Sequence, residues 1–307
     1  MAIRVWLPEA RSAADMGGLP DRFAADVWAG GEPLPGSADE VEVIVLPFGV
    51  APSRMPVLAK LPRLRLIQLM SAGAEQVIPF LPPGVTLCNA RGVHDPAVAE
   101  WIMAVILAQL RGLPRFLDAQ RAGTWEPARG EPLAGRTVLI VGYGSIGAAV
   151  ERLLAPFGVT VRRVGRRPRP GVSPARDLEE LLPEADIVIV LVPLTPATTG
   201  LVDARFLGRM RDGALLVNAA RGPVVDTGAL LDALRSGRLR AALDVTDPEP
   251  LPAGHPLWSA PGLLLTPHVA GAMTTGTHRV MAMVRDQLER YAAGLPLRNV
   301  VSPAEGY

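Results

Sequence analysis

Short runs of apolar residues recur along the whole chain, and in its second half they alternate with segments of helical length. The runs are Ile3–Leu7, Val41–Leu46, Leu64–Leu69, Val85–Leu87, Thr137–Val141, Val159–Val164, Asp186–Val192, Ala214–Val217, Leu239–Val245 and Leu263–Thr266. The intervening segments are Ile146–Phe157, Asp177–Leu182, Asp203–Met210 and Thr227–Ser236. Continuous apolar strands that alternate with helices are typical of a parallel sheet covered on both faces. The sequence therefore predicts an α/β fold with doubly wound, Rossmann-like domains, each built on a mainly parallel sheet.

Length, charge and cysteine content limit the class of protein further. At roughly 150 residues per domain, 307 residues correspond to about two domains. The net charge is +1, which argues against a dedicated nucleic-acid binder. The single cysteine, Cys88, excludes an internal disulfide and a zinc cluster, so we expect no metal site and a reducing, cytoplasmic location. No apolar run approaches ~18 residues, so we expect no membrane span.

Two long helical segments indicate how the domains are divided. Asp95-Pro96 is a helix start signal, and apolar residues follow it at helical spacing as far as Leu110. A second long helix is expected at about 275–293. Because these segments bracket the strand–helix array, we expect a discontinuous first domain of residues 1–92 plus 272–307. Residues 93–271 would form a dinucleotide-binding domain.

A glycine-rich turn follows the strand Thr137–Val141. Residues 142–147, Gly-Tyr-Gly-Ser-Ile-Gly, match the pattern GxGxxG and open a helix near Ser145. In this context Gly142 allows the tight turn, Gly144 lets the backbone approach a pyrophosphate, and Gly147 lets the helix pack close to the strand. The amides of Ser145 and Ile146, at the helix start, would face the phosphates. The alternative is an ordinary strand–turn–helix connection.

The end of the next strand bears on which dinucleotide binds. An NAD site needs a carboxylate there for the ribose 2′-hydroxyl, but this chain has Gly165 followed by Arg166 and Arg167. Two guanidinium groups suit a 2′-phosphate. We therefore expect NADP(H) to be preferred, with NAD(H) possible. The alternative is a solvated basic loop, because the neighbours include Arg162, Arg163 and Arg169.

Three later strands are followed by residues with complementary chemistry: Arg221, Glu249 and His268. Reduction of a 2-keto acid needs a hydride donor, a proton donor and a group that binds the carboxylate. Histidine suits proton donation near neutrality, a carboxylate orients the ring, and arginine binds a carboxylate in a bidentate manner.

Each of these three residues also has a structural interpretation. His268 could be a structural histidine, Glu249 a rigid surface acid, and Arg221 a helix cap. The remaining histidines are interpreted as structural or solvated: His94, His255 and His278.

Taken together, the motifs resemble the D-isomer-specific 2-hydroxyacid dehydrogenases over nearly the whole chain. The motifs are, in order, Ser71-Ala72-Gly73, Val98-Ala99-Glu100, the glycine-rich turn, Val192-Pro193-Leu194-Thr195, Asn218-Ala219-Ala220-Arg221-Gly222, Asp244-Val245, Glu249-Pro250 and Thr266-Pro267-His268-Val269-Ala270-Gly271. The Gly165-Arg166-Arg167 segment looks like the NADP-dependent glyoxylate/hydroxypyruvate reductases of this family. Members that oxidise formate carry glutamine where this chain has Glu249, so formate oxidation is not expected.

The resemblance implies a set of roles. Arg221 binds the substrate carboxylate and carbonyl, His268 is the acid/base, and Glu249 pairs with it. Backbone amides around Ser71, Ala72 and Gly73 hold the substrate carboxylate. The cofactor side comprises Val192 and Pro193 against the nicotinamide, Asp244 on its carboxamide, and Ala219.

The resemblance also implies an overall organisation: an active site in the cleft between the domains, a flavodoxin-like substrate domain, and a homodimer built largely on the long helix after Asp95. The expected activity is NAD(P)H-dependent reduction of a small 2-keto acid, such as glyoxylate or hydroxypyruvate, to the D-2-hydroxy acid. Two alternatives remain: a dinucleotide-sensing binding protein without significant turnover, and a dehydrogenase for an unusual donor such as phosphite.

Overall fold

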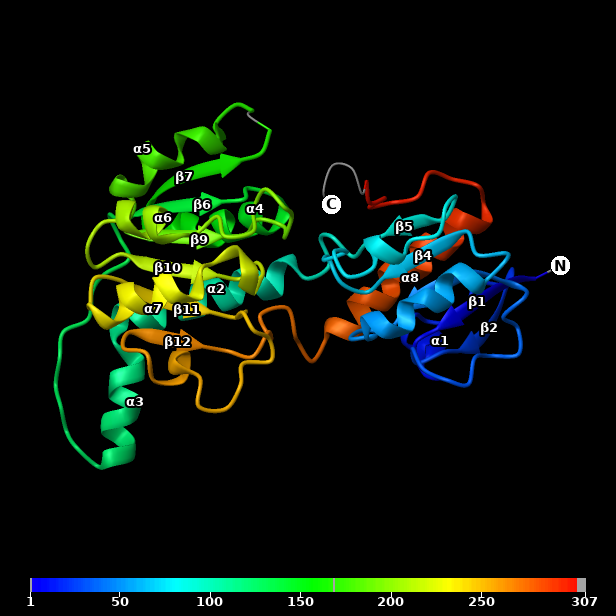
Figure 1. Cartoon of the computed structure of the whole chain (residues 1–307), viewed down its shortest axis with the longest axis horizontal. Helices are drawn as coiled ribbons and strands as arrows, with labels where there is room; N and C mark the ends of the chain where they lie inside the picture. Colours follow the sequence, from blue (N-terminus) through cyan, green and yellow to red (C-terminus); the bar gives the residue numbers. More distant parts are fainter. Residues whose placement is uncertain (1, 168, 303–307) are drawn as a thin grey trace. The chain divides into compact units, whose positions relative to one another are not determined.

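The computed structural model describes residues 2–167 and 169–302 and divides the chain into two compact units. The smaller unit comprises Met1–His94 with Ala272–Tyr307, and the larger unit is Asp95–Gly271. Each contains one sheet, of five and seven strands, and every strand pair in both ladders is parallel (Figure 1). The predicted α/β class with parallel sheets is confirmed.

The smaller unit has the strand order β2-β1-β3-β4-β5, which is a flavodoxin-like order. Its elements are β1 (Ile3–Leu7), α1 (Ser12–Asp15), β2 (Phe23–Val27), β3 (Val41–Leu46), η1 (Pro52–Lys60), β4 (Leu66–Leu69), η2 (Ile78–Phe80), β5 (Thr86–Cys88) and α8 (Gly276–Ala292). Side chains alternate between the faces of the central strand: Val43 and Val45 pack in the cluster that contains α8, whereas Ile44 belongs to the opposite cluster with η1. Both faces are therefore buried, which explains the continuous apolar runs.

The larger unit has the strand order β12-β11-β10-β9-β6-β7-β8. Its elements are α2 (Asp95–Arg111), α3 (Leu113–Ala122), β6 (Thr137–Val141), α4 (Ser145–Leu154), η3 (Ala155–Phe157), β7 (Thr160–Gly165), β8 (Ser173–Pro174), η4 (Ala175–Asp177), α5 (Leu178–Leu181), η5 (Leu182–Glu184), β9 (Ile187–Val190), α6 (Ala204–Arg209), β10 (Leu215–Asn218), η6 (Gly222–Val224), α7 (Thr227–Arg235), β11 (Arg240–Leu243), η7 (Pro256–Ser259) and β12 (Leu263–Leu265). Strand order reverses between β6 and β9, and ligands of doubly wound sheets bind at such a switch point.

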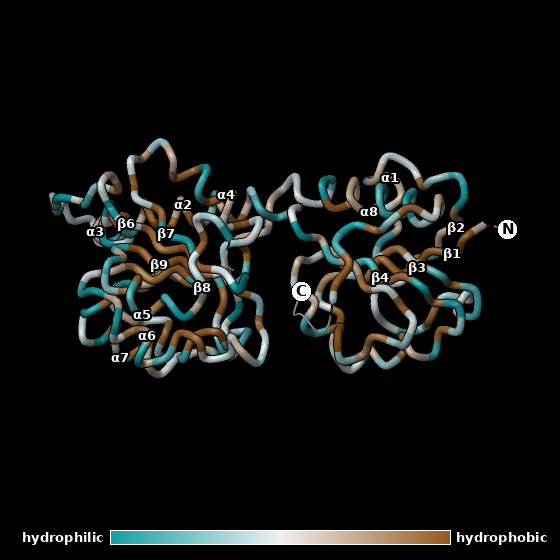
Figure 2. The backbone as a smooth tube through the Cα atoms, turned by 90° about the horizontal axis from the view of Figure 1, so that it is seen from above, coloured by the Kyte–Doolittle hydropathy of each residue, from teal (hydrophilic) through white to brown (hydrophobic). Residues whose placement is uncertain are grey.

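Two apolar clusters cover the faces of the larger sheet. One contains residues of α2 and α4, and the other contains residues of α5, α6 and α7. Figure 2 shows the strands β6 and β9 as hydrophobic segments at the centre of the larger unit. This sandwich fixes the carboxyl ends of neighbouring strands at one edge, where the loops with the predicted site residues begin.

Two strands lie outside the sequence prediction, and both are at sheet edges. In β2 only Phe23 is buried and the other residues alternate between half-buried and exposed, and β8 has only two residues, one of them proline. An edge strand needs no continuous apolar run, so neither produced the signal that identified the other strands.

Among the described residues, no single helix is long and apolar enough to cross a membrane. The pair α2 and α3 passes a test of length and composition only when joined, and the two helices are bent by 65° at their junction.

Candidate active site

The glycine-rich turn joins β6 to α4 at the switch point. Gly142 has φ of 97°, and a Cβ atom there would lie 2.6 Å from the carbonyl carbon of Leu191 and 2.7 Å from the amide nitrogen of Val192. Any side chain would therefore collide with the backbone at the end of β9. Only glycine allows the chain to turn this close to the neighbouring strand.

The other two glycines of the motif have different surroundings. A Cβ atom on Gly144 would meet nothing within 4 Å, whereas one on Gly147 would lie 3.1 Å from Tyr143 and 3.2 Å from Ile140. No side chain caps the N-terminus of α4, which begins at Ser145. The turn thus has open space above its middle glycine, uncapped helix amides and close helix–strand packing, which together fit a pyrophosphate.

The strand after this turn ends in a basic segment. β7 ends at Gly165, and Arg166 and Arg167 are both exposed directly after it. No carboxylate stands at the strand end where an NAD site would need one.

Val192, Pro193 and Ala219 are half-buried and follow β9 and β10 at the same sheet edge. The structure thus places these predicted cofactor residues beside the switch point.

Asp244 organises the loop that follows β12. Its carboxylate is buried and accepts hydrogen bonds from the Thr266 hydroxyl at 2.6 Å and from the amides of Val269 and Ala270 at 2.8 Å. Its backbone carbonyl also accepts from the amide of His268 at 2.7 Å. Asp244 therefore holds the segment on both sides of His268, a contribution that sequence reasoning missed.

His268 pairs with Glu249. The ring Nδ1 of His268 lies 2.5 Å from Oε1 of Glu249, and the two side chains are 47% and 38% exposed. His268 has φ of 55°, a left-handed conformation that is uncommon for residues other than glycine, and the contacts to Asp244 maintain it. Because Nδ1 is hydrogen-bonded to the Glu249 carboxylate, the other ring nitrogen, Nε2, is the one that can contact a ligand.

Arg221 lies in the loop after β10, and the next residue, Gly222, contacts the segment that leads to Glu249. A Cβ atom on Gly222 would lie 1.8 Å from the carbonyl oxygen of Thr246, so the two backbones are in direct contact there. The half-buried Arg221 side chain donates from Nη1 to the Ala220 carbonyl at 2.6 Å, and it provides no side-chain cap to η6. Arg221 thus occupies the N-cap position of η6 without a capping hydrogen bond from its side chain.

In the smaller unit, the Ser71–Gly73 loop is fixed through its carbonyl groups. Asn89 donates from its side-chain amide to the Ala72 carbonyl at 2.7 Å, and the Ser71 hydroxyl donates to the Gly73 carbonyl at 2.9 Å. The amide of Ala90 donates to the Ser71 carbonyl at 2.8 Å. These contacts fix the backbone of the loop through all three of its carbonyl groups.

The remaining histidines have separate positions. His94 places Nε2 2.9 Å from the Met70 carbonyl, directly before the Ser71 loop, and His255 accepts from the Leu257 amide at the start of η7. His278 is exposed on α8. Sequence reasoning did not identify the contact of Asn89 with the Ser71–Gly73 loop, although Asn89 directly follows β5, nor the contact of His94 with Met70.

Comparison with known proteins adds independent information. The sequence model described as "D-isomer specific 2-hydroxyacid dehydrogenase, NAD binding domain" matches residues 103–270. Glyoxylate/hydroxypyruvate reductase B of Escherichia fergusonii is 33% identical over 299 residues, which cover 91% of this chain and 87% of that protein.

Two solved structures cover the chain completely. A D-isomer specific 2-hydroxyacid dehydrogenase from Xanthobacter autotrophicus Py2, in complex with NADPH and MES, has a TM-score of 0.83 and 32% identity, covering 100% of this chain and 99% of that one. An NADPH-dependent glyoxylate/hydroxypyruvate reductase from Sinorhizobium meliloti, in complex with NADP and sulfate, has a TM-score of 0.86 and 26% identity, covering 100% of both chains.

Proposed function

We propose that this chain, which belongs to the D-isomer-specific 2-hydroxyacid dehydrogenase family, reduces a small 2-keto acid to the D-2-hydroxy acid with NADPH. The observation that carries the proposal is the contact between His268 Nδ1 and Glu249 Oε1. The names of the relatives favour glyoxylate or hydroxypyruvate as the substrate class.

The residues present fit a dinucleotide. The glycine turn from Gly142 to Gly147 and the uncapped start of α4 would hold the pyrophosphate, and Arg166 and Arg167 would bind the 2′-phosphate of NADP(H). NADPH is favoured over NADH because the strand end lacks a carboxylate and because both solved relatives contain NADPH or NADP. When bound, the nicotinamide cofactor supplies the hydride.

The protein supplies the proton and the carboxylate contacts. Glu249 fixes the imidazole of His268 through Nδ1, so that Nε2 donates its proton to the oxygen of the keto group as the alkoxide forms. Arg221 stabilises the developing negative charge and binds the substrate carboxylate. In the smaller unit, the amides of Ser71–Gly73 are the proposed carboxylate donors.

A steady-state screen tests the proposal. Purified protein is incubated with NADPH or NADH and with glyoxylate, hydroxypyruvate, pyruvate or bulkier 2-keto acids, and cofactor absorbance is followed. We expect turnover with a small keto acid and a higher kcat/KM for NADPH than for NADH. If no keto acid consumes either cofactor, the reductase proposal is wrong, and the two alternatives are a dinucleotide-binding protein without turnover and a dehydrogenase for an unusual donor such as phosphite.

The variant His268→Gln tests the proton donor. General acid catalysis contributes about 10² to 10⁴ in rate, so we expect kcat to fall by more than a hundredfold while the affinity for NADP⁺ stays unchanged. The matched control is His278→Gln, because His278 is an exposed histidine on α8, outside the compact unit that carries the pair. Near-normal turnover in His268→Gln would remove His268 from the mechanism.

We also propose that the chain forms a homodimer. α2 buries nine of its 17 residues within its own unit, whereas none of the ten residues of α3 is buried. Leu113 and Leu117 on α3 are each 49% exposed, and Trp125 just beyond the helix is 96% exposed. These exposed apolar side chains favour α3, rather than α2, as the contact with a second chain. Light scattering after size-exclusion chromatography checks the mass, and a monomer would overturn the proposal.

A further inference from the structure

Tyr143, the variable residue between the first two glycines of the turn, is enclosed by charged side chains. Two guanidinium groups lie within cation–π distance of its ring: Cζ of Arg163 is 5.6 Å from the ring centroid and Cζ of Arg169 is 5.4 Å from it. Its hydroxyl donates to Oε2 of Glu151 at 2.5 Å. The phosphate-binding turn is thereby connected to α4, to β7 and to the segment that follows β7.

The charge of Arg163 is already balanced. Its Nε donates to Oε2 of Glu151 at 2.8 Å, and its Nη2 donates to Oε1 of the same carboxylate. The hydrogen bond from Arg163 lowers the pKa of Glu151, so the carboxylate stays ionised beside it. Arg163 and Glu151 therefore form a neutral pair that supports one side of the Tyr143 ring.

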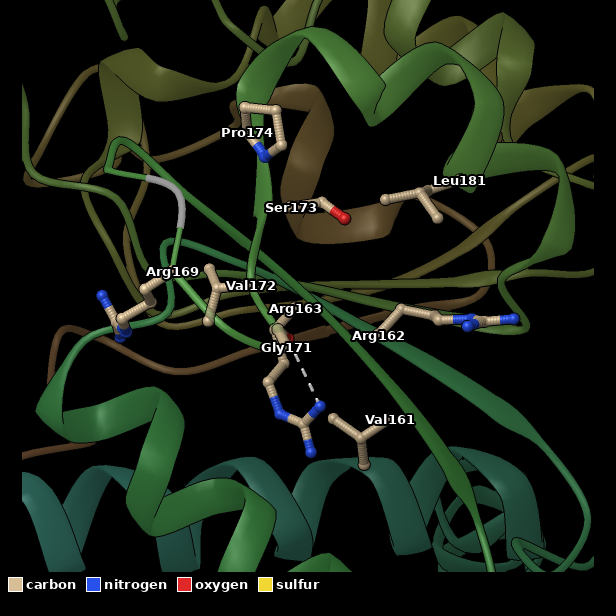
Figure 3. A pocket seen from close by; sticks show the side chains of 9 residues that line it. All are labelled: Val161, Arg162, Arg163, Arg169, Gly171, Val172, Ser173, Pro174 and Leu181. Carbon is tan, nitrogen blue, oxygen red and sulfur yellow. Dashed lines mark hydrogen bonds between the residues drawn. The ribbon is translucent and has the colours of Figure 1, made fainter.

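Arg169, the second guanidinium group near the ring, has different partners. Its Nη2 donates to the backbone carbonyl of Tyr143 at 2.7 Å, and within the part of the chain that the structure describes no carboxylate forms an ion pair with it. Figure 3 shows Arg163 and Arg169 lining a hollow of about 450 Å³ beside the edge of β7, with Arg163 directed toward Gly171. Arg169 therefore contributes a net positive charge next to the turn.

These contacts restrict the basic segment that is expected to bind the 2′-phosphate. Gly165 is the last residue of β7, and the Arg169 backbone forms a bridge with Val172 while its side chain lies on Tyr143. Arg166 and Arg167 thus lie between two fixed points only four residues apart. Fixing a loop in its binding conformation raises affinity because less freedom is lost when the ligand binds.

We propose that Arg169 is a positioning residue for the 2′-phosphate of NADP(H). By binding the ring and the carbonyl of Tyr143, it fixes the Arg166–Arg167 segment against the glycine turn. This role rests on the proposed NADP(H) preference, and it makes Tyr143 a determinant of cofactor choice although it lies within the pyrophosphate turn.

The experiment measures the dissociation constants of NADP⁺ and NAD⁺ by isothermal titration calorimetry. In Arg169→Ala we expect the affinity for NADP⁺ to fall about tenfold and the affinity for NAD⁺ to change less than twofold. Arg169→Lys keeps the charge but loses the planar group that stacks on Tyr143, so we expect it to recover only part of the loss. The matched control is Arg162→Ala, which removes a charge from the same hollow but not from Tyr143, and it should leave the ratio of the two affinities unchanged.

Variants of Tyr143 separate positioning from direct contact. Tyr143→Phe keeps the ring and should leave the affinity ratio unchanged, whereas Tyr143→Ala should lower it about as much as Arg169→Ala does. The double variant of Tyr143→Ala and Arg169→Ala should lower the affinity ratio no more than either single variant does. If the two reductions in the ratio multiply instead, or if Arg169→Lys restores full affinity for NADP⁺, Arg169 acts independently of Tyr143 and the positioning role is wrong.

The two proposals fail in distinguishable ways. Equal wild-type affinities for NADP⁺ and NAD⁺ would overturn the cofactor preference and the role of Arg169 together. A wild-type preference for NADP⁺ that persists in Arg169→Ala would overturn only the role of Arg169.

Discussion

Replacing Gly222 by alanine tests whether the loops of Arg221 and Glu249 must be in direct contact. An ideal Cβ atom at this position would lie 1.8 Å from the carbonyl oxygen of Thr246 and 2.1 Å from its carbonyl carbon. Real Cβ atoms essentially never approach another heavy atom closer than 3.0 Å, so the two backbones must separate by at least 1.2 Å. This displacement moves either Arg221 or the segment that leads to Glu249.

The size of the displacement gives the expected loss. A shift of about 1 Å in a catalytic group costs on the order of a hundredfold in rate, because the reacting groups leave their productive geometry. We therefore expect Gly222→Ala to lower kcat/KM for the keto acid by about a hundredfold, or roughly 2.7 kcal/mol of transition-state stabilisation. The affinity for NADP⁺ should change less than kcat/KM does, since the glycine turn and the Arg166–Arg167 segment lie on other strands.

The assay combines steady-state kinetics with NADPH, calorimetric binding of NADP⁺ and a thermal melt. The control is Gly208→Ala on α6, where a Cβ atom meets nothing within 4 Å; it should retain activity and gain up to about 1 kcal/mol of stability. If Gly222→Ala folds and keeps kcat/KM within threefold of the wild type, the contact between the loops is not needed and the argument is refuted.

Three further perturbations have expected outcomes. Asp244→Asn leaves one of the three donors to this carboxylate without an acceptor. We therefore expect the free energy of unfolding to fall by about 1–3 kcal/mol, the Tm to fall by several degrees and kcat to be reduced. Unchanged values would show that these hydrogen bonds do not hold the His268 loop. Arg163 holds the pKa of Glu151 below its ordinary value of 4.5, so the pair stabilises the fold fully above that pH and loses its effect as the pH falls through the lowered pKa. The Tm difference between the wild type and Glu151→Gln should therefore shrink from pH 7 toward pH 3, and a constant difference would contradict this assignment. Burial raises the pKa of the Cys88 thiol to about 12, so a thiol reagent at pH 8 should label the protein only after unfolding, and rapid labelling of the native chain would show that the smaller sheet opens readily.

The fold could be predicted from the sequence because its signals are local. Strands buried on both faces must be apolar throughout, so the runs Thr137–Val141 and Ala214–Val217 identify β6 and β10 within one residue. Edge strands do not need to be apolar throughout, which is why the sequence did not predict β2 and β8. In the structure the break between α2 and α3 falls at Gly112, whose φ of 68° suits glycine.

The candidate site was only partly accessible from the sequence. The motifs located Arg221, Glu249, His268 and the glycine turn, but not the groups that support them. Asp244 as the acceptor of three donors, the contact of Gly222 with Thr246, and the position of Asn89 on the Ala72 carbonyl join residues far apart in the chain.

The sequence alone predicted every strand except β2 and β8, a glycine-rich turn suited to a phosphate, and the side chains that have the chemistry for proton transfer. Each of these depends on residue type at short spacing: burial on both faces demands apolar strands, and a tight turn demands glycine. The tertiary structure decided how those side chains are oriented, because the left-handed backbone of His268, its bond to Glu249 and the enclosure of Tyr143 by Arg163 and Arg169 arise only when separate strands are aligned in one parallel sheet. The orientation of a side chain depends on differences of a few tenths of an ångström in the distances between segments. No single stretch of sequence contains that information.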